Sequence, residues 1–196
     1  MKILVVDDTL KQRDAAKKAF AGHNLTVVST AQEARELLEE KFDNEKFLKL
    51  QKESGFSEDY RSWEEKDEEK KTLYNKLSNE CYVYPNFDVV LTDLLMPGEK
   101  NGLGSQGSQF INEPTPYGFG IAMLAIKNKV SKVAIVSMGD HHSHPILWFC
   151  DAISGTVFPG FKIFTHIAMS KEEFPDIENP WEIKDWARAL KNLLEK

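Results

Sequence analysis

The stretch FDVVLTDLLMPG, residues 87–98, decides how this chain is interpreted, because a run of apolar residues ends on the carboxylate of Asp93. An apolar run without polar alternation is typical of a parallel strand that is covered on both faces. An isolated charge there is costly, so the aspartate must be hydrogen-bonded, paired with a cation or placed at the open end of the sheet. The sequence therefore predicts a cationic or reactive site where this strand ends.

Similar apolar runs recur along the chain, with amphipathic helical patterns between them. We expect strands at residues 2–6, 25–29, 87–92, 132–136 and 161–167, and helices at 9–20, from 31 onward, 119–129, 145–153 and 181–194. Strands that alternate with helices build a parallel sheet. The predicted fold class is α/β, with a doubly wound five-stranded parallel sheet in one domain that spans residues 1–196.

Two segments interrupt this alternation. Residues 39–85 are dense in Glu and Lys and are predicted to form an inserted, charged helical hairpin. Its aromatic side chains would either hold the hairpin together or dock a partner: Phe47, Phe56, Tyr60, Trp63 and Tyr74. Residues 99–117 form a second insertion, a long Gly/Ser/Pro-bearing loop expected near the site, and loops of this length usually have a lid or binding role.

Composition excludes several classes of protein. The formal net charge of −6 argues against a nucleic-acid binder, which usually has a basic face. Cys81 and Cys150 are too few for a disulfide framework. The apolar run ILVV before Asp7 is too short for a signal peptide or a membrane span. We expect a cytoplasmic protein with no direct nucleic-acid or membrane partner.

Polar residues follow three of the predicted strands. Asp7 and Asp8 end the first, Asp93 ends the third and Ser137 ends the fourth. In an open parallel sheet these ends face the ligand crevice, so three carboxylates are expected to share one edge. Crowded carboxylates raise at least one pKa unless a cation neutralises them, and a set of oxygen ligands suits Mg²⁺. An aspartate can also act as a nucleophile and form an aspartyl phosphate, and Asp93 is the candidate.

The order of VVDD (5–8), VVLTDLLMPG (89–98), VAIVS (133–137) and a later lysine resembles the response-regulator receiver domain of two-component signalling. The resemblance covers most of the chain outside the two insertions and implies a flavodoxin-like fold of the receiver type. It implies a phosphoprotein in which Asp93 is the phosphoacceptor. The metal ligands that it implies for Mg²⁺ are Asp7, Asp8, Asp93 and the carbonyl of Leu95.

The resemblance also gives roles to a hydroxyl and a lysine. Ser137 matches the hydroxyl that contacts the phosphoryl group, and Lys171 is the best match to the lysine that pairs with phosphoryl oxygens, with Lys162 as the competing choice. Glu172 follows Lys171 where the family often has proline, and Ala168 stands at the usual aromatic position. The implied donor is a histidine-kinase or phosphotransfer-type protein. The signal would leave through an unknown output protein, and the chain would at most dephosphorylate itself.

Other interpretations stay open. The fold could serve as a pseudo-receiver that binds partners without phosphorylation. DDTL (7–10) resembles the D-x-D-x-T of haloacid-dehalogenase-like phosphatases, although Asp7 and Asp8 are adjacent here. GLGSQG (102–107) matches G-x-G-x-x-G but neither follows a strand nor opens a clear helix, so a flexible loop is favoured. GDHHSH (139–144) offers His141, His142 and His144 as weak metal ligands; a polar loop is favoured there too.

Overall fold

The computed structural model describes residues 1–55, 68–98, 105–138, 144–154, 156 and 158–195. The chain divides into two compact units, one made of residues 1–39 and 85–196 and the other of residues 40–84. The second unit occupies nearly the same stretch as the insertion expected at residues 39–85. In the described residues, no helix is both long enough and apolar enough to cross a membrane.

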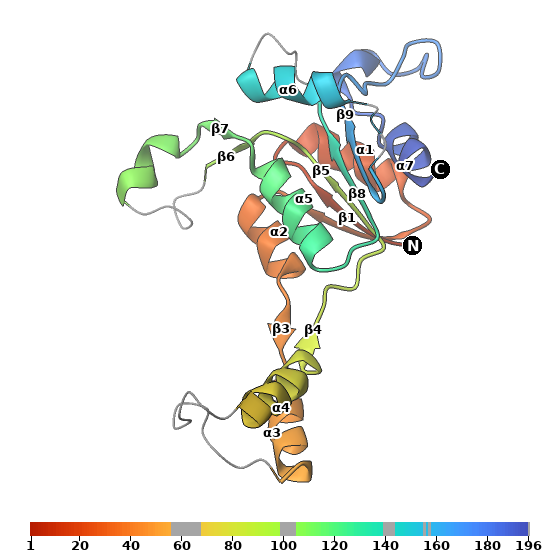
Figure 1. Cartoon of the computed structure of the whole chain (residues 1–196). Helices are drawn as coiled ribbons and strands as arrows, with labels where there is room; N and C mark the ends of the chain where they lie inside the picture. Colours follow the sequence, from red (N-terminus) through yellow and green to blue (C-terminus); the bar gives the residue numbers. More distant parts are fainter. Residues whose placement is uncertain (56–67, 99–104, 139–143, 155, 157, 196) are drawn as a thin grey trace. The chain divides into compact units, whose positions relative to one another are not determined.

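The first unit is built on a five-stranded sheet in which every neighbouring pair of strands is parallel (Figure 1). The strand order is β2-β1-β5-β8-β9. Their bounds are β1 Lys2–Val6, β2 Asn24–Val28, β5 Val89–Thr92, β8 Lys132–Val136 and β9 Phe161–Phe164. With helices packed against it, this sheet confirms the predicted flavodoxin-like α/β fold.

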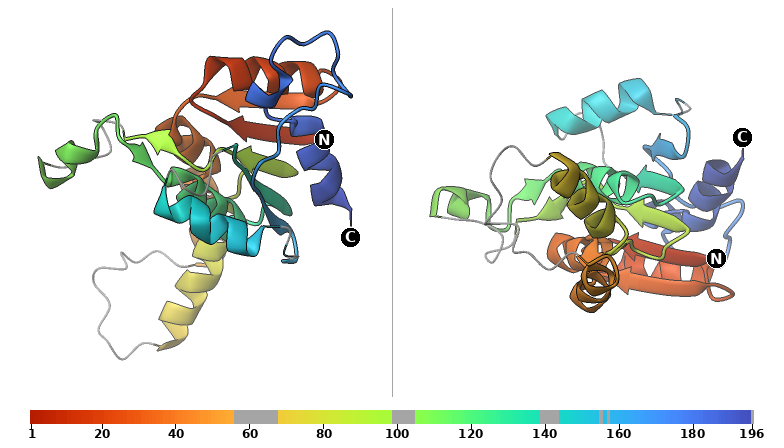
Figure 2. Two further views of the ribbon diagram at one scale, coloured as in Figure 1. Left: turned by 90° about the horizontal axis from the view of Figure 1, so that it is seen from above. Right: turned by 60° about the horizontal axis from the view of Figure 1, so that its bottom comes forward.

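Helices cover both faces of the sheet (Figures 1 and 2). They are α1 Leu10–Ala19, α2 Ala31–Leu38, α5 Tyr117–Lys127, α6 Pro145–Ile153 and α7 Trp186–Leu194. Successive strand residues point to opposite faces, so Leu4 and Val6 pack in the core with α2, α5 and α6. Ile3 and Val5 pack on the other face with α1 and α7. Two apolar cores therefore lie on opposite faces of the sheet.

The helix ends follow local chemistry. Thr30 and Glu33 form a capping box at the start of α2. The final helix begins at Trp186, not at residue 181 as predicted, because Asp185 caps it by accepting a hydrogen bond from the Arg188 N–H. The preceding Pro180–Glu182 segment is a short 3₁₀ turn. This later start leaves residues 183 and 184 outside the helix.

The glycine at position 118 is required by close packing of α5 behind Asp93. A Cβ atom at Gly118 would lie 2.1 Å from the Asp93 carbonyl oxygen, which is far inside van der Waals contact. The N–H of Gly118 also donates to the Leu94 carbonyl. The start of α5 is thus pressed against the backbone that follows β5.

The second predicted insertion contains more regular structure than a loop. Within it, η3, Ser105–Phe110, is a 3₁₀ helix, and strand β7, Pro114–Thr115, pairs in antiparallel fashion with β6, Met96–Pro97, which lies just before the insertion. Of the GLGSQG stretch, residues 102–104 lie outside the described residues, and the rest belongs to η3, so no phosphate-binding turn between a strand and a helix is described there.

The described part of the second unit contains two helices and a short antiparallel ladder. Their bounds are β3 Lys41–Phe42, α3 Asn44–Glu53, α4 Glu68–Asn79 and β4 Tyr82–Val83. Phe47 and Tyr74 meet edge to face across α3 and α4, and Phe42 contacts both Phe47 and Tyr82. These aromatic residues thus hold the unit together. Phe56, Tyr60 and Trp63, also expected to contribute, lie outside the described residues.

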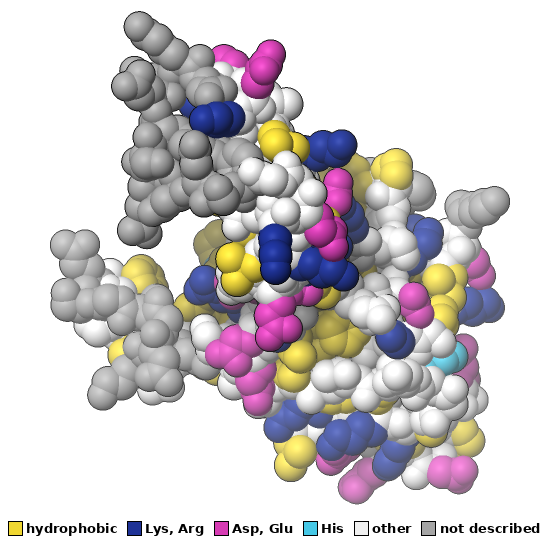
Figure 3. Space-filling model, turned by 90° about the horizontal axis from the view of Figure 1, so that it is seen from below, with side chains coloured by type: hydrophobic (Ala, Val, Ile, Leu, Met, Phe, Trp, Pro, Cys, Tyr) yellow, Lys and Arg dark blue, Asp and Glu magenta, His cyan; other side chains and the backbone are white. Residues whose placement is uncertain are grey.

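On the face shown in Figure 3, the visible Lys and Arg side chains are interspersed with Asp and Glu. A nucleic-acid binder usually gathers its basic side chains into one patch. Side chains of both charges therefore lie next to one another on this face.

Candidate functional site

The carboxyl ends of β1 and β5 bring three aspartates together. The two strands pair in parallel with Val6 opposite Thr92, so the residues that follow them become neighbours. Carboxylate oxygens of Asp7, Asp8 and Asp93 lie within 4.8 Å of one another. Asp7 is fully buried and Asp8 is exposed, so the cluster has one side in the core and one side toward solvent. This is the acidic cluster that the strand ends predicted.

A buried lysine lies between two of these carboxylates. The Nζ atom of Lys184 is 2.5 Å from Asp7 Oδ2 and 2.7 Å from Asp93 Oδ1, and the lysine side chain is only 4% exposed. The same ammonium lies 5.3 Å from the centre of the Trp186 ring. Two backbone groups complete the set, because the Thr9 N–H donates to Asp7 and the Leu94 N–H to Asp93. Each buried charge therefore has an opposite charge or a donor beside it.

Burial and charge act against each other in this cluster. Burial raises the pKa of Asp93 from 3.8 to about 6; the Asp7 charge acts in the same direction and Lys184 opposes it. Burial by itself would lower the pKa of Lys184, but the carboxylates of Asp93 and Asp7 outweigh it, and the pKa rises. Lys184 is therefore charged at neutral pH. Burial and the Asp7 charge also raise the pKa of Asp8.

Lys184 takes the place that the sequence assigned to Lys171. The Lys171 ammonium is exposed and donates to the Ile177 carbonyl at 2.6 Å. Lys162, the competing choice, donates to the carbonyls of Asn192 and Glu195. The structure brings neither lysine to the aspartates, and the lysine that lies beside them is Lys184.

The backbone explains how so late a lysine reaches the sheet edge. After β9 the chain makes an excursion and returns to pair Ala168 with Lys184 in an antiparallel bridge. The Asp185 N–H donates to the Ile167 carbonyl at 2.9 Å, and the Met169 N–H donates to the Ile183 carbonyl at 2.8 Å. One signal in the sequence was missed: Asp185 is a good N-cap residue before an amphipathic stretch, which places Lys184 at the entrance of the helix.

A small hollow of about 220 Å³ opens beside the cluster. Three of its lining residues were predicted from the sequence: Asp93, Leu95 and Ser137. Ser137 is 4% exposed, follows β8 and is held by its N–H, which donates to the Phe164 carbonyl. The other lining residues are Thr9, Gln12, Met138 and Lys184, none of which the sequence singled out for this site. An anion in this hollow would meet an ammonium, a hydroxyl and a carboxylate.

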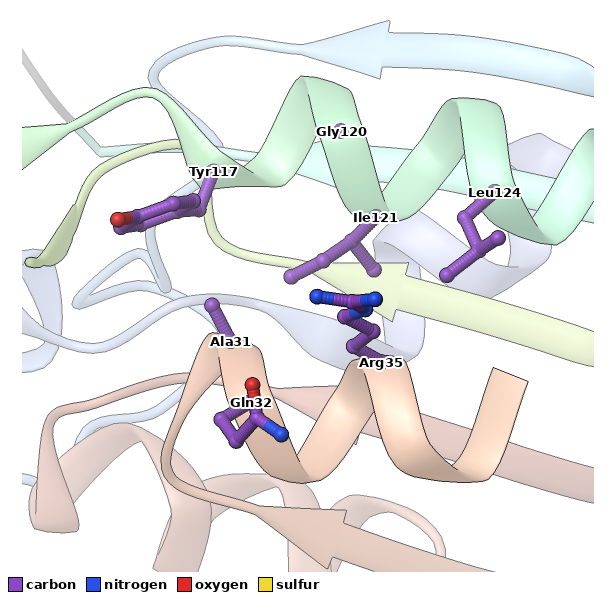
Figure 4. Close-up of a pocket in the computed structure, with 7 residues that line it drawn as sticks. All are labelled: Ala31, Gln32, Arg35, Tyr117, Gly120, Ile121 and Leu124. Atoms are coloured by element: carbon purple, nitrogen blue, oxygen red, sulfur yellow. The ribbon is translucent and has the colours of Figure 1, made fainter. Parts of the chain in front are cut away.

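A larger groove of about 370 Å³ lies elsewhere, between α2 and α5 (Figure 4). Its walls are mostly apolar, and Ile121 and Leu124 point from α5 toward α2. The charged residue in its lining is Arg35, whose Nε atom is 2.5 Å from a Glu39 carboxylate oxygen. None of the described residues that line this groove is a carboxylate, so the groove has no counterpart of the aspartate cluster.

The histidine segment gives no metal site in the described residues. His144 caps α6, because its Nδ1 atom accepts a hydrogen bond from the Ile146 N–H at 3.2 Å. Asp140, His141 and His142 lie outside the described residues. The described histidine of this segment therefore has a structural role at a helix end.

The aspartate cluster fits a divalent cation by its donor chemistry. Carboxylate oxygens are the ligands that Mg²⁺ prefers, and it commonly takes one or two of them and completes its shell with water and phosphate oxygens. Asp8 gives the cluster an open side for such ligands.

Comparisons of the chain with protein-family models, with curated proteins and with solved structures give no match. The function of the chain is therefore inferred from the geometry of the aspartate cluster.

Proposed function

We propose that the protein is a receiver-like phosphoacceptor that takes a phosphoryl group onto Asp93 with Mg²⁺. The observation that carries this proposal is the bridge from Lys184 to both Asp7 and Asp93 beside a hollow that Ser137 also lines. A nucleophile, two further carboxylates, a fixed cation and a hydroxyl then stand at the carboxyl edge of a parallel sheet, where ligands of such folds bind. The resemblance in sequence assigns the same roles to Asp93, Asp7, Asp8 and Ser137.

In this proposal an Asp93 carboxylate oxygen attacks the phosphorus of the donor. The new O–P bond forms as the bond from phosphorus to the leaving group breaks, and the leaving group keeps the electron pair. The Lys184 ammonium balances charge on the phosphoryl oxygens as a point charge, and the Ser137 hydroxyl donates a hydrogen bond to one of them. Asp93 must be ionised to attack, and its raised pKa of about 6 leaves it mostly ionised at neutral pH.

The carboxylates of Asp7, Asp8 and Asp93, with the Leu95 carbonyl, are the proposed ligands of Mg²⁺. When bound, the ion supplies positive charge against the phosphoryl oxygens during transfer. Lys184 already compensates Asp7 and Asp93 on the buried side. Asp8, on the exposed side, forms no ion pair with Lys184, so its charge is the one that a bound Mg²⁺ would mainly compensate.

The proposed donor is a histidine-kinase or phosphotransfer-type protein in the cytoplasm. Phosphorylation replaces one carboxylate charge by about −1.5 to −2 charges near neutral pH. The added charge alters the balance around Lys184 and Ser137 and would pass to an output protein through the surface. Such a protein turns over no substrate beyond its own phosphoryl group and needs no nucleic acid or membrane.

The test is the mass of the intact protein after incubation with acetyl phosphate, with and without Mg²⁺. The wild type should gain one phosphoryl group only with Mg²⁺, and Asp93→Asn should gain none. Asp14→Asn is the matched control, since Asp14 is an exposed aspartate paired with Lys17 on α1. Phosphorylation that persists in Asp93→Asn, or that is lost in Asp14→Asn, would refute the assignment.

A second candidate is a binding module with the same fold and no phosphoryl chemistry. The observation that favours it is the tight pairing of Lys184 with Asp7 and Asp93, which neutralises much of the cluster without any metal. For this candidate, acetyl phosphate leaves the mass unchanged, and partner capture from cell extract is the same for wild type and Asp93→Asn.

A further inference from the structure

One glutamine side chain holds the segment that carries the site lysine. Gln12 lies on the first turns of α1 and is 7% exposed. Its Oε1 atom accepts a hydrogen bond from the Lys184 N–H at 2.8 Å, and its Nε2 atom donates to the Glu182 carbonyl at 2.9 Å. Its backbone carbonyl accepts a hydrogen bond from the Trp186 indole N–H at 3.0 Å. Gln12 therefore forms hydrogen bonds with Glu182, Lys184 and Trp186, which are before, at and after the site lysine.

The same side chain reaches the segment that follows β8. Its Nε2 atom lies 3.6 Å from the Met138 sulfur, and Met138 directly follows Ser137. Gln12, Met138, Ser137 and Lys184 all line the hollow beside Asp93. One amide thus touches both chain segments that bring a donor to the proposed phosphoryl site.

Lys184 needs such a brace because of how it reaches the sheet. It belongs to no strand of the five-stranded sheet, and the single-residue bridge to Ala168 pins its backbone on one side. A lysine side chain has many rotamers, so an ion pair fixes the position of its ammonium only when its own backbone is fixed. The Gln12 amide supplies that restraint from α1.

We infer that Gln12 is a positioning residue, which rests on the proposed function of the site. It holds the Lys184 ammonium between Asp7 and Asp93 and couples the lysine segment to the segment of Ser137. It does so as a combined donor and acceptor, a pairing that an aliphatic side chain of similar length cannot supply. Among the described residues, the hydrogen bonds of the Gln12 side chain go to Glu182, Lys184 and Met138 and to none of the three carboxylates, so its replacement should spare the metal ligands.

The test compares Gln12→Met with Gln32→Met. Methionine preserves the length and apolar volume of the side chain and removes both polar groups. Gln32 is the matched control, since its amide donates to Glu36 on the surface of α2. Three quantities are measured: the initial rate of phosphorylation by acetyl phosphate at saturating Mg²⁺, the Mg²⁺ affinity by calorimetry, and the rate at which acetic anhydride acetylates Lys184 relative to Lys171, by mass spectrometry.

In Gln12→Met the phosphorylation rate should fall roughly tenfold, which is the size expected from one or two lost hydrogen bonds. The Mg²⁺ affinity should stay within about twofold, because the carboxylates keep their places. Acetylation of Lys184 should be at least roughly tenfold faster than in wild type, since a loosened segment opens more often. Gln32→Met should change none of these values.

A folded Gln12→Met in which Lys184 stays as protected as in wild type overturns the inference. Equal losses of rate and Mg²⁺ affinity also overturn it, because they indicate general damage to the site. If wild type gains no phosphoryl group, the proposed function fails, and Lys184 acetylation still decides the role of Gln12. If Gln12→Met does not fold, Gln12→Glu decides. It keeps the acceptor for the Lys184 N–H but removes the donor to the Glu182 carbonyl, so acetylation of Lys184 above wild type supports the inference and unchanged protection overturns it.

Discussion

Replacing Lys184 by methionine should leave two carboxylates facing each other in the interior. The lysine side chain is 4% exposed, Asp7 is 0% and Asp93 is 15%, so water cannot easily take over the role of the ammonium. Removing one partner of a buried ion pair typically costs about 3–5 kcal/mol. We therefore expect Lys184→Met to lower the free energy of unfolding by about that amount at pH 8.

The loss of unfolding free energy in Lys184→Met should depend on pH. Lys184 lowers the pKa of Asp93, which is about 6 in wild type, so removing the lysine raises that pKa further. The folded variant then holds the Asp93 proton to a higher pH than wild type, whereas the unfolded chain releases it at its ordinary pKa. For each further unit by which the Asp93 pKa rises, the loss of unfolding free energy at a pH above that pKa grows by about 1.4 kcal/mol. At pH 5 Asp93 is protonated in the folded variant, and the loss is smaller than at pH 8.

The assay is urea denaturation of metal-free protein at pH 5 and pH 8, repeated at pH 8 with Mg²⁺. Lys171→Met is the matched control, since this exposed lysine bonds only a carbonyl in the described contacts, and it should cost less than about 1 kcal/mol. Added Mg²⁺ should restore part of the stability of Lys184→Met by binding the carboxylate cluster from its open side at Asp8. A loss that is equal at both pH values, or no larger than that of Lys171→Met, would refute this account of the cluster.

Three further predictions follow from packing and burial. Gly120→Ala should stabilise the protein by up to about 1 kcal/mol, because a Cβ atom at Gly120 meets nothing within 4 Å. Gly118→Ala should destabilise it, because its Cβ atom would lie 2.1 Å from the Asp93 carbonyl oxygen. Thermal denaturation of the two variants checks both expectations. In metal-free protein, the rise of the Asp93 pKa from 3.8 to about 6 should remove up to about 3 kcal/mol of stability between pH 4 and pH 7, and Asp93→Asn should flatten this slope in denaturant titrations. Burial raises the pKa of Cys150 to about 11, so iodoacetamide at pH 8 should label it only after denaturation; rapid labelling of folded protein would contradict its burial.

The sequence by itself determined the sheet and the acidic part of the site. Runs such as Lys2–Val6 and Val89–Thr92 are apolar without alternation, which is the pattern of a strand buried on both faces. Parallel pairing then places the residues after two such strands side by side, so Asp7, Asp8 and Asp93 meet wherever the strands are neighbours. Periodicity and strand ends are local features, and they need no knowledge of distant contacts.

Only the tertiary structure decided which lysine serves the cluster. Lys171 and Lys184 are both ordinary lysines among acidic neighbours in the sequence, and Lys171 lies nearer to the last strand. The choice depends on the bridge between Ala168 and Lys184 and on the Gln12 amide of α1, contacts between residues far apart along the chain. Local pattern cannot encode such contacts, because they form only once the helices pack on the sheet. That packing buries the Lys184 ammonium against Asp7 and Asp93 and leaves Lys171 at the surface.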